Sequence, residues 1–106
     1  MNNKGFFEQV YDIVVTIPQG SVITYGTIAQ MLGRPGAAKL VGYAMHSAPY
    51  DRNLPCHRVV NRNGTMAPGG IFGGEKNQRR ILEEEGVTFL ENGCIDMELH
   101  AIRLVF

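Results

Sequence analysis

The segment from Leu54 to Val60 contains the residues best suited to covalent chemistry. Cys56 is followed directly by His57 and Arg58, at the start of a short apolar run. A cysteine attacks other atoms as its thiolate, and neighbouring cationic or hydrogen-bonding groups make that thiolate available near neutral pH. The segment therefore predicts a reactive cysteine. The alternative is that Cys56 is a small buried hydrophobic residue, as many cysteines are.

Length and composition predict one compact domain over residues 1–106, large enough to form a core without disulfides. Of the two cysteines, Cys94 has no base or cation beside it, so we assign it a structural role. Cysteine and histidine are too sparse for a zinc site, and we predict neither a metal nor another cofactor. No signal peptide or membrane-spanning stretch is visible, which predicts a reduced, cytoplasmic protein.

The neutral net charge conceals a basic middle. Between Arg34 and Arg80 there are eight basic residues and two acidic ones, whereas the rest of the chain has two basic residues and eight acidic ones. Such clustering can be a solvated surface. It is also the electrostatic pattern of proteins that bind phosphates, and of DNA-binding proteins in particular.

The first half of the chain predicts three helices. Apolar residues at helical spacing indicate an amphipathic helix over 4–17. Thr24 is a candidate N-cap of a short helix that stops at Gly33, and a turn at 34–36 leads into a helix over 37–45. Two short helices joined by a tight turn are typical of a helix-turn-helix.

The second of these helices is rich in small residues, notably Ala37, Ala38, Gly42 and Ala44. Small side chains let a helix approach a nucleic-acid groove closely, and Lys39 adds a cation. An ordinary helical hairpin, with its alanines packed in a core, explains the same spacing. The pattern alone leaves both interpretations open.

The second half is expected to contain a short buried strand, a turn, a glycine-rich loop, a helix and a terminal hairpin or strand. These elements correspond to residues 59–60, 61–64, 66–74, 75–85 and 87–106. The loop lacks the lysine and hydroxyl residues of a P-loop, so we interpret it as a lid over a pocket. Gly86 is the expected helix C-cap. The fold class predicted is mostly α with a short β element, a winged helix-turn-helix-like DNA-binding domain.

Taken together, these motifs resemble the C-terminal domain of 6-O-alkylguanine-DNA alkyltransferases. The resemblance runs from about residue 6 to residue 90 and rests on five features in a specific order: Tyr25 and its helix, the helix-turn-helix over 33–45, the segment 55–60, Gly73–Gly74 and 85–87. No part of these 106 residues resembles the family's N-terminal domain, so we expect a protein without it.

The resemblance implies a mechanism and a partner. A monomer would bind double-stranded DNA containing alkylated guanine and flip the base out of the stack. Cys56 would then take the alkyl group in one displacement and act only once. His57 matches the family's general base, which works through a water, and Glu85 the carboxylate that orients it. Tyr25 matches the tyrosine that gives a proton to the leaving guanine.

The resemblance also implies contact residues. Those expected at DNA are Arg34, Ala37, Ala38, Lys39, Tyr43 and Arg58, and those expected in the base pocket are Met45, Pro55, Ile71, Phe72 and Gly73. Four of the functional residues have structural alternatives, and for His57 the alternative is a hydrogen-bonded structural residue. Arg58 could fasten loops, Glu85 could lie on a solvated helix face, and Tyr25 could be a core aromatic.

The chain departs from the family pattern at three places. Lys39 stands where the family has an arginine that fills the gap left by the flipped base, and lysine lacks the planar guanidinium. Ala48 replaces an asparagine that helps to hold the active-site segment. The loop between Gly64 and Gly73 is longer than the common pattern, with Ile71 or Phe72 in place of pocket-lining tyrosine and serine.

These departures keep two alternatives open. The short length resembles the alkyltransferase-like proteins, which typically have tryptophan in place of the cysteine and mark lesions for excision-repair proteins. In that case Cys56 would be retained but unproductive. The second alternative is a transcription regulator that reads base sequence with its helix-turn-helix.

Overall fold

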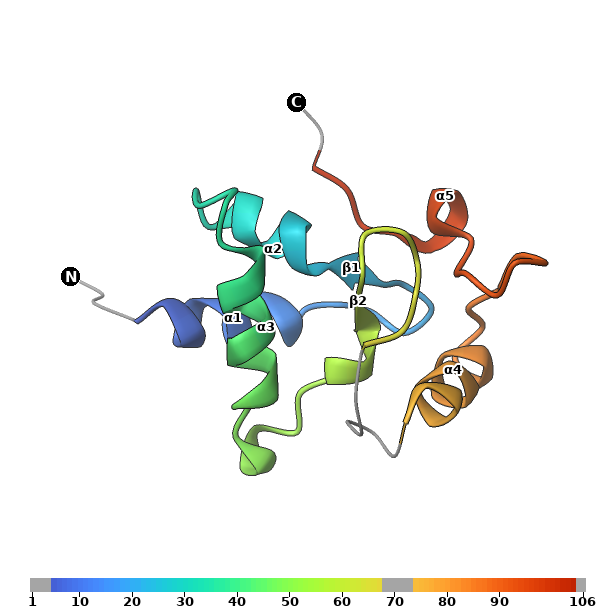
Figure 1. Cartoon of the computed structure of the whole chain (residues 1–106). Helices are drawn as coiled ribbons and strands as arrows, with labels where there is room; N and C mark the ends of the chain where they lie inside the picture. The colour runs from blue at the N-terminus through green and yellow to red at the C-terminus, as the bar shows by residue number, and fades with distance from the viewer. Residues whose placement is uncertain (1–4, 68–73, 105–106) are drawn as a thin grey trace.

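The computed structural model describes residues 5–67 and 74–104. Helices α1 (Phe6–Val14), α2 (Tyr25–Met31) and α3 (Ala38–His46) gather on one side of two short strands, and α4 (Glu75–Glu84) and α5 (Met97–His100) lie on the other (Figure 1). Within the described ranges, no helix is long and apolar enough to cross a membrane. The predicted mostly helical fold with a short β element is confirmed.

The two strands join distant parts of the chain. Strand β1 (Ile23–Thr24) pairs in parallel with β2 (Val59–Val60), with Ile23 opposite Val59 and Thr24 opposite Val60. The four strand residues are buried. Strand β2 was predicted, whereas β1 was not. The pairing places the segment that precedes α2 beside the segment that follows Cys56.

Helix α1 ends earlier than predicted, at Val14 instead of residue 17. Three consecutive β-branched residues, Val14, Val15 and Thr16, lose side-chain freedom in a helix. The Thr16 hydroxyl also donates to the Ile13 carbonyl at 2.6 Å. The helix therefore tightens into a turn that leads towards β1.

The helix-turn-helix forms with the predicted cap and turn. The Thr24 hydroxyl accepts from the Thr27 backbone N–H at 3.0 Å, as expected of an N-cap. After α2, Gly33 has a φ of +73°, and Arg34 N–H donates to the Ala29 carbonyl at 2.9 Å. These are the left-handed residue and the long backbone bond of a Schellman motif. They turn the chain sharply towards α3.

The larger of two hydrophobic clusters holds the first three helices together. The Tyr11 hydroxyl in α1 donates to the Ala44 carbonyl in α3 at 2.7 Å. The buried members of this cluster are Val10, Tyr11, Val14, Ile17, Ile23, Ile28, Ala29, Val41, Ala44 and Val59. Because strands β1 and β2 each contribute a residue, the cluster also anchors the segment after Cys56.

The second cluster secures α4 and the C-terminal segment. It contains Val22, Val60, Leu82, Val87 and Ile95. Helix α4 ends one residue before the predicted boundary and is closed by Gly86, whose φ is +96°. Gly86 closes the helix as predicted, but it stands one position after the C-cap residue, which is Glu85. The Val87 N–H donates to the Leu82 carbonyl at 3.0 Å, which completes a second Schellman motif.

The C-terminal segment differs from the prediction. An antiparallel bridge between Phe89 and Ile95 agrees with a hairpin, but the chain then forms the short helix α5 instead of a strand. The ring of His100 explains this ending. Its Nδ1 lies 2.9 Å from the Gly20 carbonyl, and its Nε2 accepts from the Thr88 N–H at 2.9 Å. These bonds fasten α5 to both neighbouring segments.

Candidate active site and nucleic-acid interface

Cys56 begins a single turn of 3-10 helix, η2 (Cys56–Arg58), which runs directly into β2. A similar turn, η1 (Tyr50–Arg52), follows α3. The Cys56 N–H donates to the Leu54 carbonyl at 2.8 Å, so the backbone is folded tightly on both sides of Pro55. Both Pro55 and Cys56 are half-buried. The pairing of β2 with β1 therefore fixes where the thiol lies.

Glu85 binds both residues that follow the cysteine. Its Oε2 lies 2.9 Å from Nε2 of His57. Arg58 donates to the same carboxylate, from Nε to Oε1 at 2.9 Å and from Nη2 to Oε2 at 2.7 Å. The three side chains are mostly buried, with exposed fractions of 18 % for His57, 15 % for Arg58 and 14 % for Glu85. The structure thus brings together His57 and Glu85, as the sequence predicted.

The position of Glu85 requires its partners. It is the C-cap residue of α4, where the helix dipole disfavours a negative charge. The hydrogen bond from Arg58, and then the bond and charge of His57, hold the pKa of the Glu85 carboxyl below its ordinary value despite partial burial. Glu85 is therefore ionised at neutral pH, and it does not lie on a solvated helix face.

Arg58 is used within the protein. In addition to its two hydrogen bonds to Glu85, Arg58 donates from Nη1 to the Ile17 carbonyl at 2.8 Å. This bond connects η2 to the segment that follows α1. This is the loop-fastening role that the sequence left open. With its donors engaged, Arg58 is not among the DNA-contacting residues that we propose below.

The environment of Cys56 keeps it a thiol. Burial raises the pKa of the Cys56 thiol above its ordinary value, and a backbone hydrogen bond only partly opposes this effect. The neighbouring residues do not offset it, since the His57 ring and the Arg58 guanidinium are both directed at Glu85. The expectation that adjacent cationic groups make the thiolate available is therefore wrong. Activation of this thiol needs a base.

Tyr25 lies within electrostatic range of the thiol. It is the first residue of α2 and packs against the larger hydrophobic cluster. Burial raises the pKa of Tyr25, and the negative charge of an ionised Cys56 raises it further. The same charge contributes to the raised pKa of Tyr11, after burial. Tyr25 therefore keeps its proton at neutral pH.

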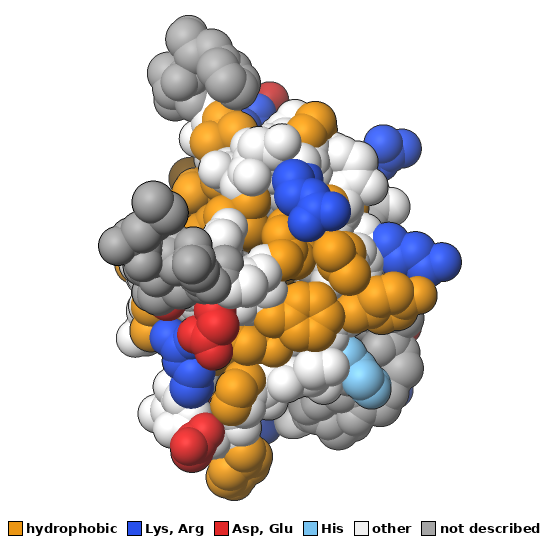
Figure 2. Space-filling model, turned by 90° about the vertical axis from the view of Figure 1, so that its left-hand side faces the viewer, with side chains coloured by type: hydrophobic (Ala, Val, Ile, Leu, Met, Phe, Trp, Pro, Cys, Tyr) orange, Lys and Arg blue, Asp and Glu red, His pale blue; other side chains and the backbone are white. Residues whose placement is uncertain are grey.

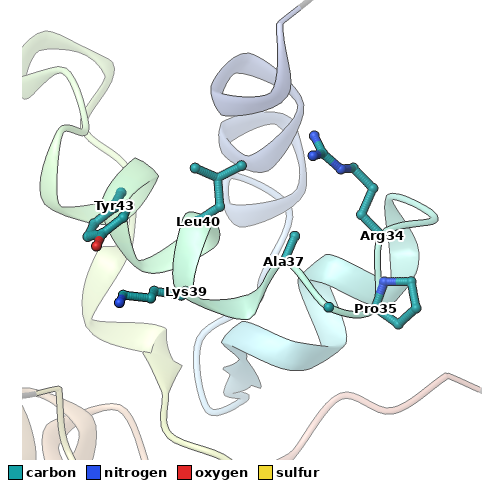
Figure 3. Close-up of a pocket in the computed structure, with 7 residues that line it drawn as sticks. Arg34, Pro35, Ala37, Lys39, Leu40 and Tyr43 are labelled. Carbon is teal, nitrogen blue, oxygen red and sulfur yellow. The ribbon is translucent and has the colours of Figure 1, made fainter.

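A groove of about 580 Å³ lies on the helix-turn-helix and not at Cys56 (Figure 3). Its lining residues are Arg34, Pro35, Gly36, Ala37, Lys39, Leu40 and Tyr43. Lys39 and Tyr43 are one helical turn apart on the same side of α3 (Figure 3). Four residues predicted to contact DNA thus line one concave surface.

The groove carries exposed groups suited to DNA. Tyr43 is 54 % exposed, and Lys39 and Arg34 are exposed as well. The Arg34 guanidinium lies over the Phe6 ring, 4.9 Å from its centroid. Figure 2 shows hydrophobic side chains gathered across one face of the molecule, with Lys and Arg side chains beside them.

The remaining predicted residues lie in three settings. Ala38 opens α3, and Met45 packs against the larger cluster. Ala48 is also packed there, where the family pattern has an asparagine. Ile71, Phe72 and Gly73 fall outside the described residues. Among the residues that are described, no group of three or more His, Cys, Asp or Glu side chains could hold a metal ion.

Gln78 contacts the candidate active site but was not predicted from the sequence. This α4 residue is fully buried, and it hydrogen-bonds the backbone of the segment that contains His57. A glutamine among charged residues of an amphipathic helix normally indicates the exposed face. Its position in the helix could have predicted its burial, because Gln78 precedes the buried Leu82 by four residues and therefore lies on the same side of α4.

Comparisons with known proteins agree with this architecture. The family model for the DNA-binding domain of 6-O-methylguanine DNA methyltransferase matches residues 5–87. Alkyltransferase-like protein 1 of Schizosaccharomyces pombe is 41 % identical over 94 % of this chain and 93 % of its own length. A methylated-DNA–protein-cysteine methyltransferase of Shigella flexneri is 46 % identical over 80 % of this chain, which spans 48 % of that protein.

Solved structures extend the similarity to three dimensions. The S. pombe alkyltransferase-like protein, in complex with damaged DNA containing O6-carboxymethylguanine, has a TM-score of 0.79 at 37 % identity, covering 98 % of this chain and 100 % of that one. A Mycobacterium tuberculosis OGT in complex with DNA has a TM-score of 0.68 at 38 % identity, covering 79 % of this chain and 51 % of the other. The chain therefore belongs to the 6-O-methylguanine DNA methyltransferase family, through the DNA-binding domain matched over residues 5–87.

Proposed function

We propose that this protein binds duplex DNA containing 6-O-alkylguanine, turns the damaged base out of the helix and transfers the alkyl group to Cys56. One observation carries the proposal. A half-buried cysteine directly precedes a histidine whose ring is held by a buried carboxylate. This is the relation of nucleophile, base and orienting group that covalent catalysis requires.

The hydrogen bond to Glu85 determines which nitrogen of His57 acts. An ionised carboxylate only accepts hydrogen bonds, so Nε2 of His57 carries the proton. In the neutral ring, Nδ1 is then the acceptor. Since Cys56 is a thiol at neutral pH, Nδ1 takes its proton, directly or through a water, as the sulfur attacks.

The transfer is a single displacement. A bond forms between Sγ of Cys56 and the alkyl carbon, while the bond from that carbon to the guanine oxygen breaks and its electron pair stays with guanine. Tyr25, which retains its proton at neutral pH, donates to the departing oxygen. The products are a thioether, which is not readily reversed, and guanine, once its new proton has moved from the oxygen to N1. The proton taken by His57 returns to Tyr25 through solvent. Each protein molecule thus accepts one alkyl group.

The groove on the helix-turn-helix supplies the DNA contact in this proposal. Arg34 and Lys39 provide positive charge, and Ala37 and Ala38 let the backbone of α3 approach the duplex closely. Relatives of similar fold have been solved on damaged DNA and on DNA. Turning the base out of the stack is needed because the reacting atoms are inaccessible within a duplex.

A second candidate is a lesion sensor that binds the alkylated base without accepting the alkyl group and recruits excision-repair proteins. The observation that favours it is similarity to the S. pombe alkyltransferase-like protein over 94 % of this chain. Lys39 and Ala48, where an arginine and an asparagine were expected, point in the same direction. The presence of Cys56 keeps transfer as the leading proposal.

The two candidates separate in one experiment. The protein is incubated with a duplex that carries a single 6-O-methylguanine, and mass spectrometry then follows the intact protein and its peptides. Transfer adds one methyl group at Cys56, while Cys94→Ala behaves as the parent and Cys56→Ala binds the lesion without gaining mass. Tight, lesion-specific binding with no mass gain supports the sensor. Equal affinity for lesion and unmodified duplexes would favour a sequence-reading regulator.

A further inference from the structure

Gln78 is a completely buried polar side chain with a partner at each end of its amide. Oε1 accepts from the Ala67 backbone N–H at 2.8 Å. Nε2 donates to the His57 carbonyl at 3.0 Å and lies 3.4 Å from the Val59 carbonyl. Because an N–H faces one end and carbonyls the other, the orientation of the amide is determined.

Helix α4 therefore holds His57 at two points. Gln78 binds its backbone carbonyl, and Glu85 binds its ring. The two α4 side chains are seven positions apart, which is close to two helical turns and places them on the same side of the helix. A rotation or shift of η2 would have to break one bond or the other.

The amide also connects η2 to a third segment. Ala67 is the last described residue before 68–73, and its N–H is buried against α4 by the same side chain. An apolar side chain would fill this interior site without the desolvation cost of an amide, and it would leave the Ala67 N–H unpaired. The bonds thus link three backbone segments rather than fill space.

We propose that Gln78 is a positioning residue for the Cys56 segment, and this inference rests on the proposed alkyl transfer. It holds the backbone of His57 while Glu85 holds the ring, and the proposed transfer requires this placement for the ring to act on the Cys56 thiol. It also joins that geometry to the backbone at Ala67. Loss of the amide should therefore misalign the base without removing any reacting group.

The test compares Gln78→Met, which removes all three side-chain hydrogen bonds at similar volume, with Lys76→Met, an exposed neighbour on α4. In single-turnover transfer from 6-O-methylguanine duplex, Gln78→Met should be at least about tenfold slower with unchanged affinity for the lesion. The nitrogen chemical shifts of the His57 ring should also change. Lys76→Met should leave both unaltered. Parental rate and parental ring shifts in Gln78→Met would overturn the inference.

The ring shifts keep the two proposals distinguishable. If the parent transfers no methyl group, the proposed transfer fails, but a changed His57 ring in Gln78→Met still supports the positioning role. If Gln78→Met does not fold, the positioning role is tested on the parent protein instead. Slow hydrogen exchange of the Gln78 side-chain amide, with nuclear Overhauser contacts to His57, supports the inference, and exchange as fast as that of an exposed amide contradicts it.

Discussion

Nε2 of His57 lies 2.9 Å from Oε2 of Glu85, and this distance determines the chemistry available to the neighbouring cysteine. The carboxylate accepts the Nε2 proton and leaves Nδ1 as the basic atom of the ring. Arg58 binds the same carboxylate, which keeps it ionised and fixed. The Cys56 thiol is protonated at neutral pH, so the proposed transfer requires a base, and we propose the ring of His57 for that role.

Glu85 should stabilise the fold in a pH-dependent way. Its folded-state pKa lies below the ordinary value of 4.5, so its contribution is fully present above about that pH and is lost as the pH falls through the lowered value. Glu85→Gln should cost about 3 kcal/mol at neutral pH, because Arg58 loses its partner in a mostly buried site. Urea unfolding at neutral and acidic pH measures both effects.

The matched control is Glu84→Gln, whose carboxylate pairs with Arg80 on the exposed surface of α4. Exposed pairs contribute about 0 to 1 kcal/mol, so this variant should unfold nearly as the parent does. If Glu85→Gln kept the acid dependence of the parent, the assignment of that dependence to Glu85 would be wrong.

The Cys56 thiol should react slowly with small alkylating reagents at neutral pH. Burial raises its pKa above the ordinary value of 9.0, so the rate with iodoacetamide should keep rising with pH beyond that value. The measurement uses Cys94→Ala, in which Cys56 is the one remaining cysteine. A rate that levels off below neutral pH would show a stable thiolate and remove the need for His57 as a base.

Lys39 should contribute an ionic contact with DNA. Lys39→Ala should lower duplex affinity and flatten the dependence of log K on log salt by about one unit. Lys76 belongs to α4, which lies on the other side of the strands from α3 (Figure 1), so Lys76→Ala should change neither quantity. Lys39→Arg should bind at least as well and increase the fluorescence of a 2-aminopurine placed beside the lesion, since a planar guanidinium can fill the gap left by the base. Unchanged binding by Lys39→Ala would mean that α3 does not face the duplex.

Tyr43 should contribute through its ring. The side chain is 54 % exposed on the groove and one turn from Lys39. Tyr43→Ala should weaken duplex binding by about 1 kcal/mol, roughly fivefold in Kd, as expected for loss of a stacking or wedge contact. The salt dependence should not change, because no charge is removed. Tyr43→Phe should bind as the parent does, and an equal loss in both variants would indicate a hydroxyl contact instead.

Residues with strong local preferences made much of the fold predictable. Thr24 caps α2, and Gly33 and Gly86 end their helices in the left-handed conformation that favours glycine. The apolar pair Val59–Val60 forms the expected strand. Each of these features depends on a few neighbouring residues, so the sequence contains the whole signal.

Contacts between distant parts of the chain were harder to predict from the sequence. Strand β1 has two residues, too few for an alternating pattern, and it forms because Val59–Val60 pairs with it. The buried role of Gln78 depends on carbonyls that precede it by about twenty residues in the chain. Arg58 reaches the Ile17 carbonyl across 41 positions. Such contacts are set by packing, and local periodicity does not encode them.

The most direct test of alkyl transfer to Cys56 is the mass of the protein after incubation with duplex DNA containing 6-O-methylguanine. Transfer predicts a gain of one methyl group per molecule, located on Cys56 and absent in Cys56→Ala. Lesion-specific binding by the parent protein with no mass gain would contradict it.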